Sequence, residues 1–223
     1  MLEKFEKFEG AYVTTRTLPM AATVATAVLL LTACGGGSDD GSDQIAGVPT
    51  DAPTSASSPT GDAVQRPKVA LPADLKLSFE GTSSGDAKKD AVWADAAERV
   101  RAMDEAIVNG KPDSPAVAFY SKGSTQSSAR TSIKWYLDHG YSLTGTTRYY
   151  NPGVTFTGSG AALTYCGDES KGYAKDRKTG KVLKTPVTKD AYVLYVTKLE
   201  KSTQGVWQTS DVLTQRGSAQ CRP

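Results

Sequence analysis

The residues most able to do chemistry are an arginine, two tyrosines and an aspartate on neighbouring predicted strands. Arg148, Tyr149 and Tyr150 lie in a stretch rich in Thr and Tyr, and Asp168 ends the strand-like stretch 161–168. If these strands are adjacent, Arg148 could contact an anion and Asp168 could be its partner. The alternative is a structural ion pair, or two solvated side chains. The candidate pocket residues are Arg148, Tyr150 and Asp168.

Metal and cofactor chemistry find little support in the residue types. His139 is the single histidine of the 223 residues, and the sequence has no C-x-x-C pair. His139 follows Asp138 and precedes Gly140, at a predicted helix end where a polar side chain can interact with exposed carbonyls. A catalytic base would need a partner there, and the neighbouring sequence suggests none. We therefore expect no metal, no cofactor and no catalytic residue.

An apolar run near the N-terminus ends in a single cysteine. Positions 20–31 are small or apolar except for two threonines, which is shorter than the roughly 20 residues of a membrane-spanning helix. Such a run is typical of a secretory signal. The segment Leu31-Thr32-Ala33-Cys34 resembles the lipobox of bacterial lipoproteins. The resemblance implies a signal peptide over 1–33, diacylglycerol on Cys34 and a place on the outer face of the cytoplasmic membrane. The alternative is an ordinary signal peptide with a chance cysteine.

The segment after Cys34 differs in composition from the rest of the chain. Residues 34–71 are rich in Gly, Ser, Asp, Thr, Ala and Pro and contain few large apolar side chains. Such a segment cannot bury enough surface to offset the entropy of ordering it. We therefore expect a disordered tether over 34–71 and a single folded domain over 72–223.

Two cysteines remain in the predicted domain. Cys166 and Cys221 form an even pair, and the predicted export places them in an oxidising compartment. We expect a disulfide between them, with two free thiols as the alternative.

Helical spacing dominates the first half of the domain. Apolar residues recur every three or four positions over 86–109, from Val92 to Ile107, and Gly110 with Pro112 predicts the end of that helix. A short helix after Ser114-Pro115 and another over 125–138 are expected next. A short edge strand over 74–80 precedes them.

Beyond Gly140 the period changes to two, which indicates strands. We expect strands over 141–150, 154–157, 161–168, 191–200 and 206–215. The tripeptide 151–153 is expected to be a turn, and 171–189 a charged connection with a hairpin tip at Thr179-Gly180. Helices followed by antiparallel strands predict an α+β fold.

This order of elements is similar to the NTF2-like (SnoaL-like) cone, with a long helix, two shorter helices and a curved sheet. The stretches 140–145, 148–150 and 206–208 also resemble small exported lipoproteins of high-GC Gram-positive bacteria. The resemblance implies a pocket between the concave sheet face and the helices, in which polar side chains orient a ligand. Some members of the fold isomerise steroids or cyclise polyketides with an aspartate base and a tyrosine donor. Homodimers through the open sheet face are common in it.

The segment 171–189 carries seven basic residues and one acidic residue. Beside a membrane it could contact anionic lipid or an anionic wall polymer. The alternative is a hairpin kept soluble by its charge. The residues of this candidate basic surface are Lys175, Arg177, Lys178, Lys181 and Lys184.

Taken together, the sequence favours a membrane-anchored lipoprotein whose domain is a non-catalytic binding or scaffold module of the cell envelope. The alternative is a small-molecule enzyme, isomerase-like or cyclase-like, that uses the cone pocket. An envelope protein or an anionic polymer is the expected partner besides the membrane, and a homodimer is compatible with either function. Nucleic acid is excluded by the predicted compartment and by the lack of a binding motif.

Overall fold

The computed structural model describes residues 64–223. The predicted signal peptide, Cys34 and the tether up to residue 63 lie outside the described residues. Within 64–223, none of the helices is long and apolar enough to cross a membrane.

Three helices form where the sequence predicts them. α1 (Ala87–Asn109) begins at Asp86, whose side chain accepts hydrogen bonds from two backbone N–H groups of the first turn. It ends at Gly110, whose φ of 67° lies in the left-handed region that favours glycine. α2 (Pro115–Phe119) begins at Ser114, and α3 (Ser124–Asp138) ends just before His139.

Six strands form one sheet with the order β1-β2-β3-β5-β6, and β4 pairs with β3 beside this path. β1 runs parallel to β2, whereas all other neighbours are antiparallel. Two short 3₁₀ helices lie at residues 189–191 and 219–221. The strands are β1 (Leu75–Phe79), β2 (Tyr141–Thr157), β3 (Gly160–Asp176), β4 (Val182–Leu183), β5 (Tyr192–Lys201) and β6 (Trp207–Arg216).

Two expectations about the strands are wrong. The tripeptide 151–153 is not a turn but an irregularity inside β2, where the register with β3 shifts between Tyr150 and Gly153. The charged segment after residue 170 is not only a connection, because β3 continues to Asp176 and the hairpin to β4 follows. Both β2 and β3 are therefore longer than their turn and charge signals indicate.

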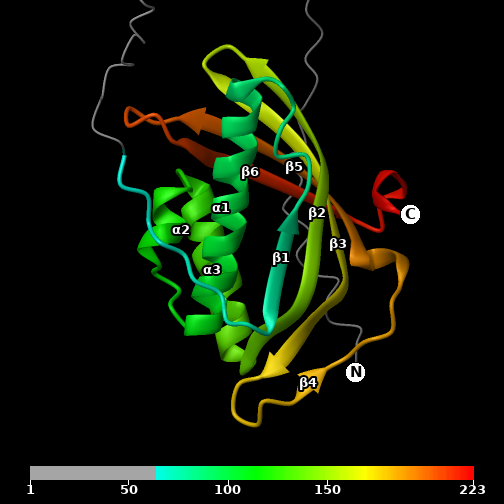
Figure 1. Ribbon diagram of the computed structural model, residues 1–223. Coiled ribbons are helices and arrows are strands. Elements are labelled where there is room, and N and C mark those ends of the chain that lie inside the picture. The colour runs from blue at the N-terminus through cyan, green and yellow to red at the C-terminus, as the bar shows by residue number, and fades with distance from the viewer. Residues whose placement is uncertain (1–63) are drawn as a thin grey trace, which may run out of the picture. The chain divides into compact units, whose positions relative to one another are not determined.

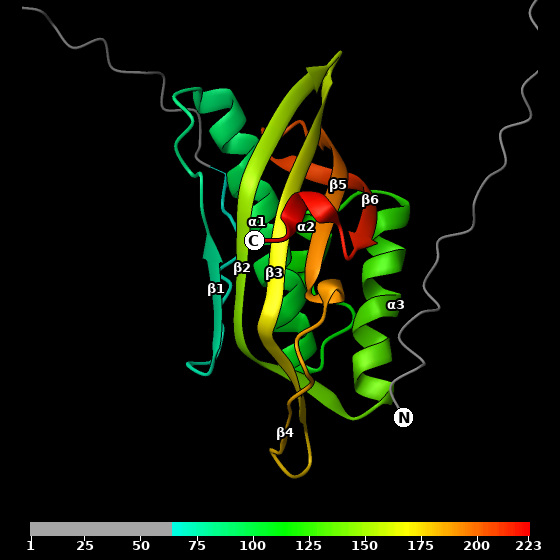
Figure 2. The ribbon, with the colours of Figure 1, turned by 90° about the vertical axis from the view of Figure 1, so that its right-hand side faces the viewer.

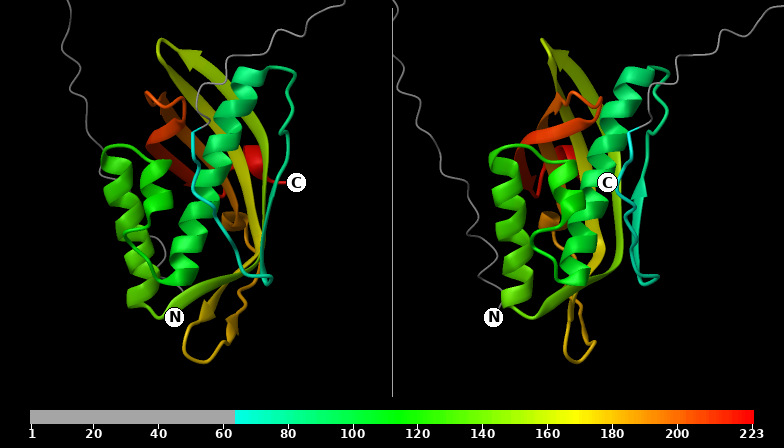
Figure 3. Two further views of the ribbon diagram at one scale, coloured as in Figure 1. Left: turned by 60° about the vertical axis from the view of Figure 1, so that its left-hand side comes forward. Right: turned by 90° about the vertical axis from the view of Figure 1, so that its left-hand side faces the viewer.

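The helices and the sheet form two layers. All three helices cover one face of the sheet, and the C-terminal segment lies on the other face (Figures 1 and 3). The hairpin that carries β4 projects beyond the sheet and the helices (Figure 2). We call the helix-covered face the inner face and the opposite one the outer face.

The core lies between α1 and the inner face. Trp93 and Ala96 of α1 pack there with Tyr149, Leu163 and Tyr165 of the sheet. A second cluster joins the other side of α1 to α2 and α3, through residues such as Ala102, Val117 and Ile133. The predicted α+β architecture, with a long helix and two shorter helices packed on a curved sheet, is confirmed.

The folded part begins earlier than the composition indicates. Val64 and Val69, assigned above to the tether, pack against the helical cluster. Arg66 forms an ion pair with Asp95 of α1, whose other oxygen accepts a hydrogen bond from the backbone N–H of Trp207 at 2.8 Å. A few apolar side chains and one buried carboxylate are sufficient to hold this polar segment in place.

Candidate functional site

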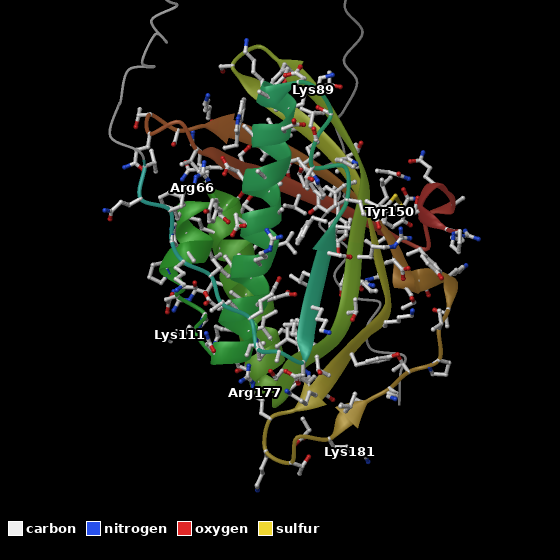
Figure 4. All side chains as sticks on the ribbon, in the orientation of Figure 1. Arg66, Lys89, Lys111, Tyr150, Arg177 and Lys181 are labelled. Atoms are coloured by element: carbon white, nitrogen blue, oxygen red, sulfur yellow. A yellow bond between two sulfur atoms is a disulfide. The ribbon has the colours of Figure 1, made fainter. Side chains whose placement is uncertain are left out.

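The predicted pocket residues are brought together, but on the outer face. Arg148 lies opposite Asp168 in the β2–β3 register, with 3.9 Å between Nη2 and Oδ2. The guanidinium lies 4.1 Å from the ring centroid of Tyr150 and also pairs with Glu80 at 3.2 Å. The Tyr150 side chain projects away from the helices (Figure 4). These residues therefore do not face the interior between helices and sheet.

The outer cluster is closed by the predicted disulfide. Cys166 and Cys221 are bonded to each other, which confirms that prediction, and they pack against the Tyr150 ring. The Tyr150 hydroxyl donates a hydrogen bond to the backbone carbonyl of Cys221. Each polar group of Arg148, Tyr150 and Asp168 already has a protein partner or faces solvent. This cluster is therefore suited to a structural role, holding the C-terminal segment against the sheet.

The inner face carries the groups that sequence reasoning missed. Alternation along β3 places Tyr165 and Glu169 on this face, and Tyr195 of β5 lies opposite Tyr165. The Tyr195 hydroxyl donates to Oε1 of Glu169 at 2.8 Å, and Arg216 of β6 donates to Oε2 at 2.8 Å. We define the inner site as six ionisable and aromatic side chains: Arg99, Asp104, Tyr136, Tyr149, Glu169 and Tyr195.

Gly167 allows the tyrosine rings of the inner site to lie close to the sheet. A Cβ atom at this position would lie 2.9 Å from Cε2 of Tyr195 and 3.4 Å from Cε1 of Tyr149. The rings of Tyr165 and Tyr195 stack at 4.8 Å between centroids, and those of Tyr149 and Tyr195 lie 6.2 Å apart. The sheet thus presents an aromatic surface to α1.

Asp104 is the group with the most unusual environment. It lies one helical turn beyond Val100, which packs on the inner core, and its carboxyl group forms no hydrogen bond or ion pair with any residue of 64–223. Loss of solvent raises the pKa of Asp104 to about 7, and the negative charge of Glu169 adds to this effect. Its carboxyl group is therefore about half protonated at neutral pH.

The tyrosines around Asp104 stay protonated. Burial raises the pKa of Tyr136 to about 12 and that of Tyr149 well above its usual range, with the charges of Asp104 and Glu169 as further causes. Burial, and after it the charge of Glu169, raises the pKa of Tyr195 well above its usual range. The hydroxyl groups of Tyr136 and Tyr149 can therefore act as hydrogen-bond donors next to a carboxyl group that titrates near neutrality, whereas that of Tyr195 already donates to Glu169.

Arg99 is the second unusual group of the inner site. Its Nε donates to the Ser121 hydroxyl at 3.0 Å, and its guanidinium forms no ion pair within 64–223. In the same range, no enclosed side-chain nitrogen or oxygen lacks a hydrogen-bond partner. The unpaired atoms of Arg99 and Asp104, both only half-buried, therefore remain in reach of solvent.

The predicted basic surface divides into two kinds of residue. Lys175 pairs with Asp74 at 2.6 Å, and Arg177 donates to the carbonyls of Ile107 and Val108, where it caps the C-terminal end of α1. Figure 4 shows Arg177 near the end of the helices and Lys181 on the projecting hairpin. Lys178, Lys181 and Lys184 have exposed side chains without an ion-pair partner in the described chain.

His139 takes the helix-end position expected from the sequence. Its Nδ1 lies 2.7 Å from the backbone carbonyl of Trp135, and its ring stacks on the indole at 4.2 Å. No group of three or more potential metal ligands of the types His, Cys, Asp and Glu occurs in residues 64–223.

Comparison with known proteins yields likeness to solved structures only. A ketosteroid isomerase-like protein from Erwinia carotovora atroseptica is 17% identical and has a TM-score of 0.42, covering 60% of this chain and 98% of its own. A Catenulispora acidiphila protein in complex with S-DNPA is 10% identical with a TM-score of 0.40, covering 56% of this chain and 93% of its own. The intermembrane space region of chloroplast protein ARC6 is also 10% identical, with a TM-score of 0.34. No family model and no curated protein matches the chain. The likeness concerns the path of the chain and assigns no activity.

Proposed function

We propose that this chain is a lipoprotein of the cell envelope whose domain binds a small molecule at the inner site. The observation that carries the binding function is the half-buried carboxyl group of Asp104, which forms no hydrogen bond or ion pair within 64–223 and lies beside protonated tyrosines. A half-buried carboxyl group has lost part of its contact with water, and a hydrogen bond from a ligand would compensate for that loss. A strongly perturbed group without a structural partner is a candidate functional group, since a ligand can supply the missing bond.

Binding is tested with the processed full-length protein and N-phenyl-1-naphthylamine, a neutral aromatic probe. With ¹³C-labelled tyrosine, saturable shifts are expected at Tyr136, Tyr149 and Tyr195, assigned through single Tyr→Phe variants. Tyr150 on the outer face is the internal control and should not shift. No saturable shift, or shifts confined to Tyr150, would contradict binding at the inner site.

A second candidate function is proton-transfer catalysis on a small carbonyl compound. The pKa of about 7 favours it, because a general acid or base works best when its pKa is near the working pH. Ionised Asp104 would remove a proton next to the carbonyl, and a tyrosine hydroxyl would donate a hydrogen bond to the oxygen that gains negative charge. Function does not follow from fold alone, so the chemistry of these residues is the whole support for this candidate.

The catalytic candidate is tested by following exchange of the α-protons of 2-tetralone in D₂O by NMR. Wild-type protein should accelerate exchange, and Asp104→Asn should lose the acceleration. If wild-type protein and Asp104→Asn exchange the ketone at the buffer rate, the enzyme candidate fails and the binding module remains.

The membrane anchor is proposed from the sequence, on the run of apolar residues that ends at Cys34. Thioether-linked lipid on this residue should move the protein into the detergent phase. Cys34→Ala should leave the protein unprocessed or release it from membranes. Unchanged detergent partitioning of the processed Cys34→Ala protein would contradict lipidation.

For the β3–β4 hairpin we propose contact with anionic lipid of the same membrane. The support is the three lysines without an ion-pair partner in 64–223, together with Val182 of the hairpin and Val187 just after it, which are two of the large apolar residues exposed in the described chain. Each basic residue near an anionic surface contributes about 1 kcal/mol. Replacing Lys178, Lys181 and Lys184 by Gln should weaken sedimentation of the Cys34→Ala protein with phosphatidylglycerol vesicles, and equal sedimentation would contradict the contact.

A further inference from the structure

Arg99 differs from the other arginines of the described chain in what it binds. Its single hydrogen bond goes to the neutral hydroxyl of Ser121. Arg177 donates to three backbone carbonyls, and Arg222 is exposed and donates to one. The remaining arginines each pair with a carboxylate: Arg66, Arg101, Arg130, Arg148 and Arg216.

The environment of Arg99 is partly buried and aromatic, and it contains no carboxylate paired with this guanidinium. Burial lowers its pKa, although a guanidinium remains charged at any pH the protein meets. Its neighbours on the sheet include Tyr165 and Tyr195, whose hydroxyl groups stay protonated and neutral. Arg99 is half-buried, and its free terminal nitrogens have no carboxylate partner, so this arginine is well placed to bind an anion.

The other charges of the inner site do not neutralise Arg99. Glu169 is already paired with Arg216 at 2.8 Å. Asp104 carries little negative charge at mildly acidic pH because its pKa is raised to about 7. At mildly acidic pH the inner site therefore holds one uncompensated positive charge next to an aromatic surface.

We propose that the ligand of the inner site is a small organic acid whose anionic group is bound by Arg99. This inference rests on the proposed binding function and names its ligand class. The free terminal nitrogens of Arg99 donate to the oxyanion, which is the geometry in which a guanidinium binds most strongly. The apolar or aromatic body of the ligand lies against the rings of Tyr149 and Tyr195, and protonated Asp104 donates a further hydrogen bond.

This arrangement makes binding dependent on pH through Asp104. The groups that face its carboxyl are Glu169 of β3, Tyr136 of α3 and Tyr149 of β2, and the tyrosines do not titrate near neutrality. As pH rises through about 7, Asp104 gains a negative charge that repels a bound anion. Affinity for an acid should therefore fall from about pH 6 to about pH 8, whereas affinity for a neutral analogue should change little.

Two probes with the same ring system test the inference. Both 8-anilinonaphthalene-1-sulfonate and N-phenyl-1-naphthylamine report binding by fluorescence, and only the first carries an anionic group. Wild-type protein should bind the sulfonate at least about tenfold more tightly near pH 6. Arg99→Gln should remove this preference and leave affinity for the neutral probe within about twofold. The control Arg101→Gln, on the same helix outside the inner site, should keep the preference.

The outcomes separate this inference from the proposed function. If neither probe binds wild-type protein, the binding function fails. If both bind and Arg99→Gln leaves the preference unchanged, the function stands and the role of Arg99 is overturned.

A measurement on wild-type protein covers the case in which Arg99→Gln does not fold. Benzoate should displace the bound sulfonate probe at concentrations where benzamide does not. This displacement should weaken as pH rises, and Asp104→Asn should flatten the pH dependence. Equal displacement by benzoate and benzamide would contradict recognition of the anion.

Discussion

Two clusters on opposite faces of β2, β3 and β5 contain the same types of residue. On the outer face, Arg148, Asp168 and Tyr150 contact one another beside the disulfide. On the inner face, arginine, carboxyl and tyrosine groups meet under α1, but within 64–223 Arg99 has no carboxylate partner and the Asp104 carboxyl group forms no hydrogen bond or ion pair. The outer groups are mutually satisfied, whereas the inner ones retain unused binding capacity.

The difference teaches that residue type is a weaker guide to function than pairing and solvation. Arg148 is 42% exposed and has two carboxylate partners, so water and protein already stabilise its charge. Arg99 is half-buried and donates only to the neutral Ser121 hydroxyl, and no carboxylate within 64–223 pairs with its charge. A polar cluster in which every group has a partner or water is suited to stabilise the fold. A polar cluster with unpaired groups is suited to bind a ligand.

The largest expected effect concerns the outer face. Cys166→Ser removes a bond that closes a loop with a sequence separation of 55 residues. In the chain-entropy model this lowers the free energy of unfolding by about 4 kcal/mol. Urea denaturation should show this loss, while the probe affinities of the inner site should not change in the folded protein. An unchanged denaturation midpoint would mean that the bridge does not stabilise the domain.

Asp104→Asn should have the next largest effect, and it should depend on pH. The pKa of Asp104 is raised in the folded state, so its contribution to stability is present at low pH and is lost as pH rises through about 7. Asparagine cannot ionise, so the variant should gain about 2–3 kcal/mol relative to wild type between about pH 5 and about pH 8. Thermal denaturation across this range measures the gain. Parallel pH curves for the two proteins would show that Asp104 is not desolvated.

Gly167→Ala tests the packing of the inner face. The added methyl group would lie 2.9 Å from the Tyr195 ring, so the ring must move away from the sheet. Overpacking of this kind should destabilise the protein by about 1–2 kcal/mol and weaken probe binding. Combining it with Tyr195→Leu should recover part of the stability. A fully stable single variant with wild-type affinity would show that the rings are not held in this arrangement.

Arg148→Gln should have the smallest effect. The pairs of Arg148 with Glu80 and Asp168 are exposed to solvent, and such pairs contribute less than about 1 kcal/mol. Neither the sulfonate nor the neutral probe should bind differently. A large loss of sulfonate affinity in this variant, with none in Arg99→Gln, would move the anion site to the outer face.

Much of the fold could be predicted from short-range signals. The apolar spacing from Val92 to Ile107 and the end at Gly110 predict α1. The disulfide could be predicted because two cysteines remain in the domain and the predicted export places them in an oxidising compartment. The pairing of Arg148 with Asp168 also followed from the order of strands. Their face did not, because the register shifts between Thr146 and Arg148 and between Tyr150 and Gly153 change the alternation of β2.

The inner site could not be predicted, because its groups come from α1, α3 and three strands and meet only through the curvature of the sheet. One signal was present for Asp104. A carboxyl group follows Val100 by four positions, on the edge of the apolar stripe of a helix that must be buried. For Arg99 no sequence signal distinguishes a free guanidinium from the paired one of Arg101.

The segment before β1 determines where a mechanical load enters the domain. A force applied to the chain from its N-terminal side acts on Val64 and Arg66 before it acts on any strand, and Arg66 forms an ion pair with Asp95. Asp95 in turn accepts the backbone N–H of Trp207, so the force spreads into α1 and β6 together. A force applied from this side is therefore shared between a helix and the strand at the far edge of the sheet from β1 before it acts on β1 itself.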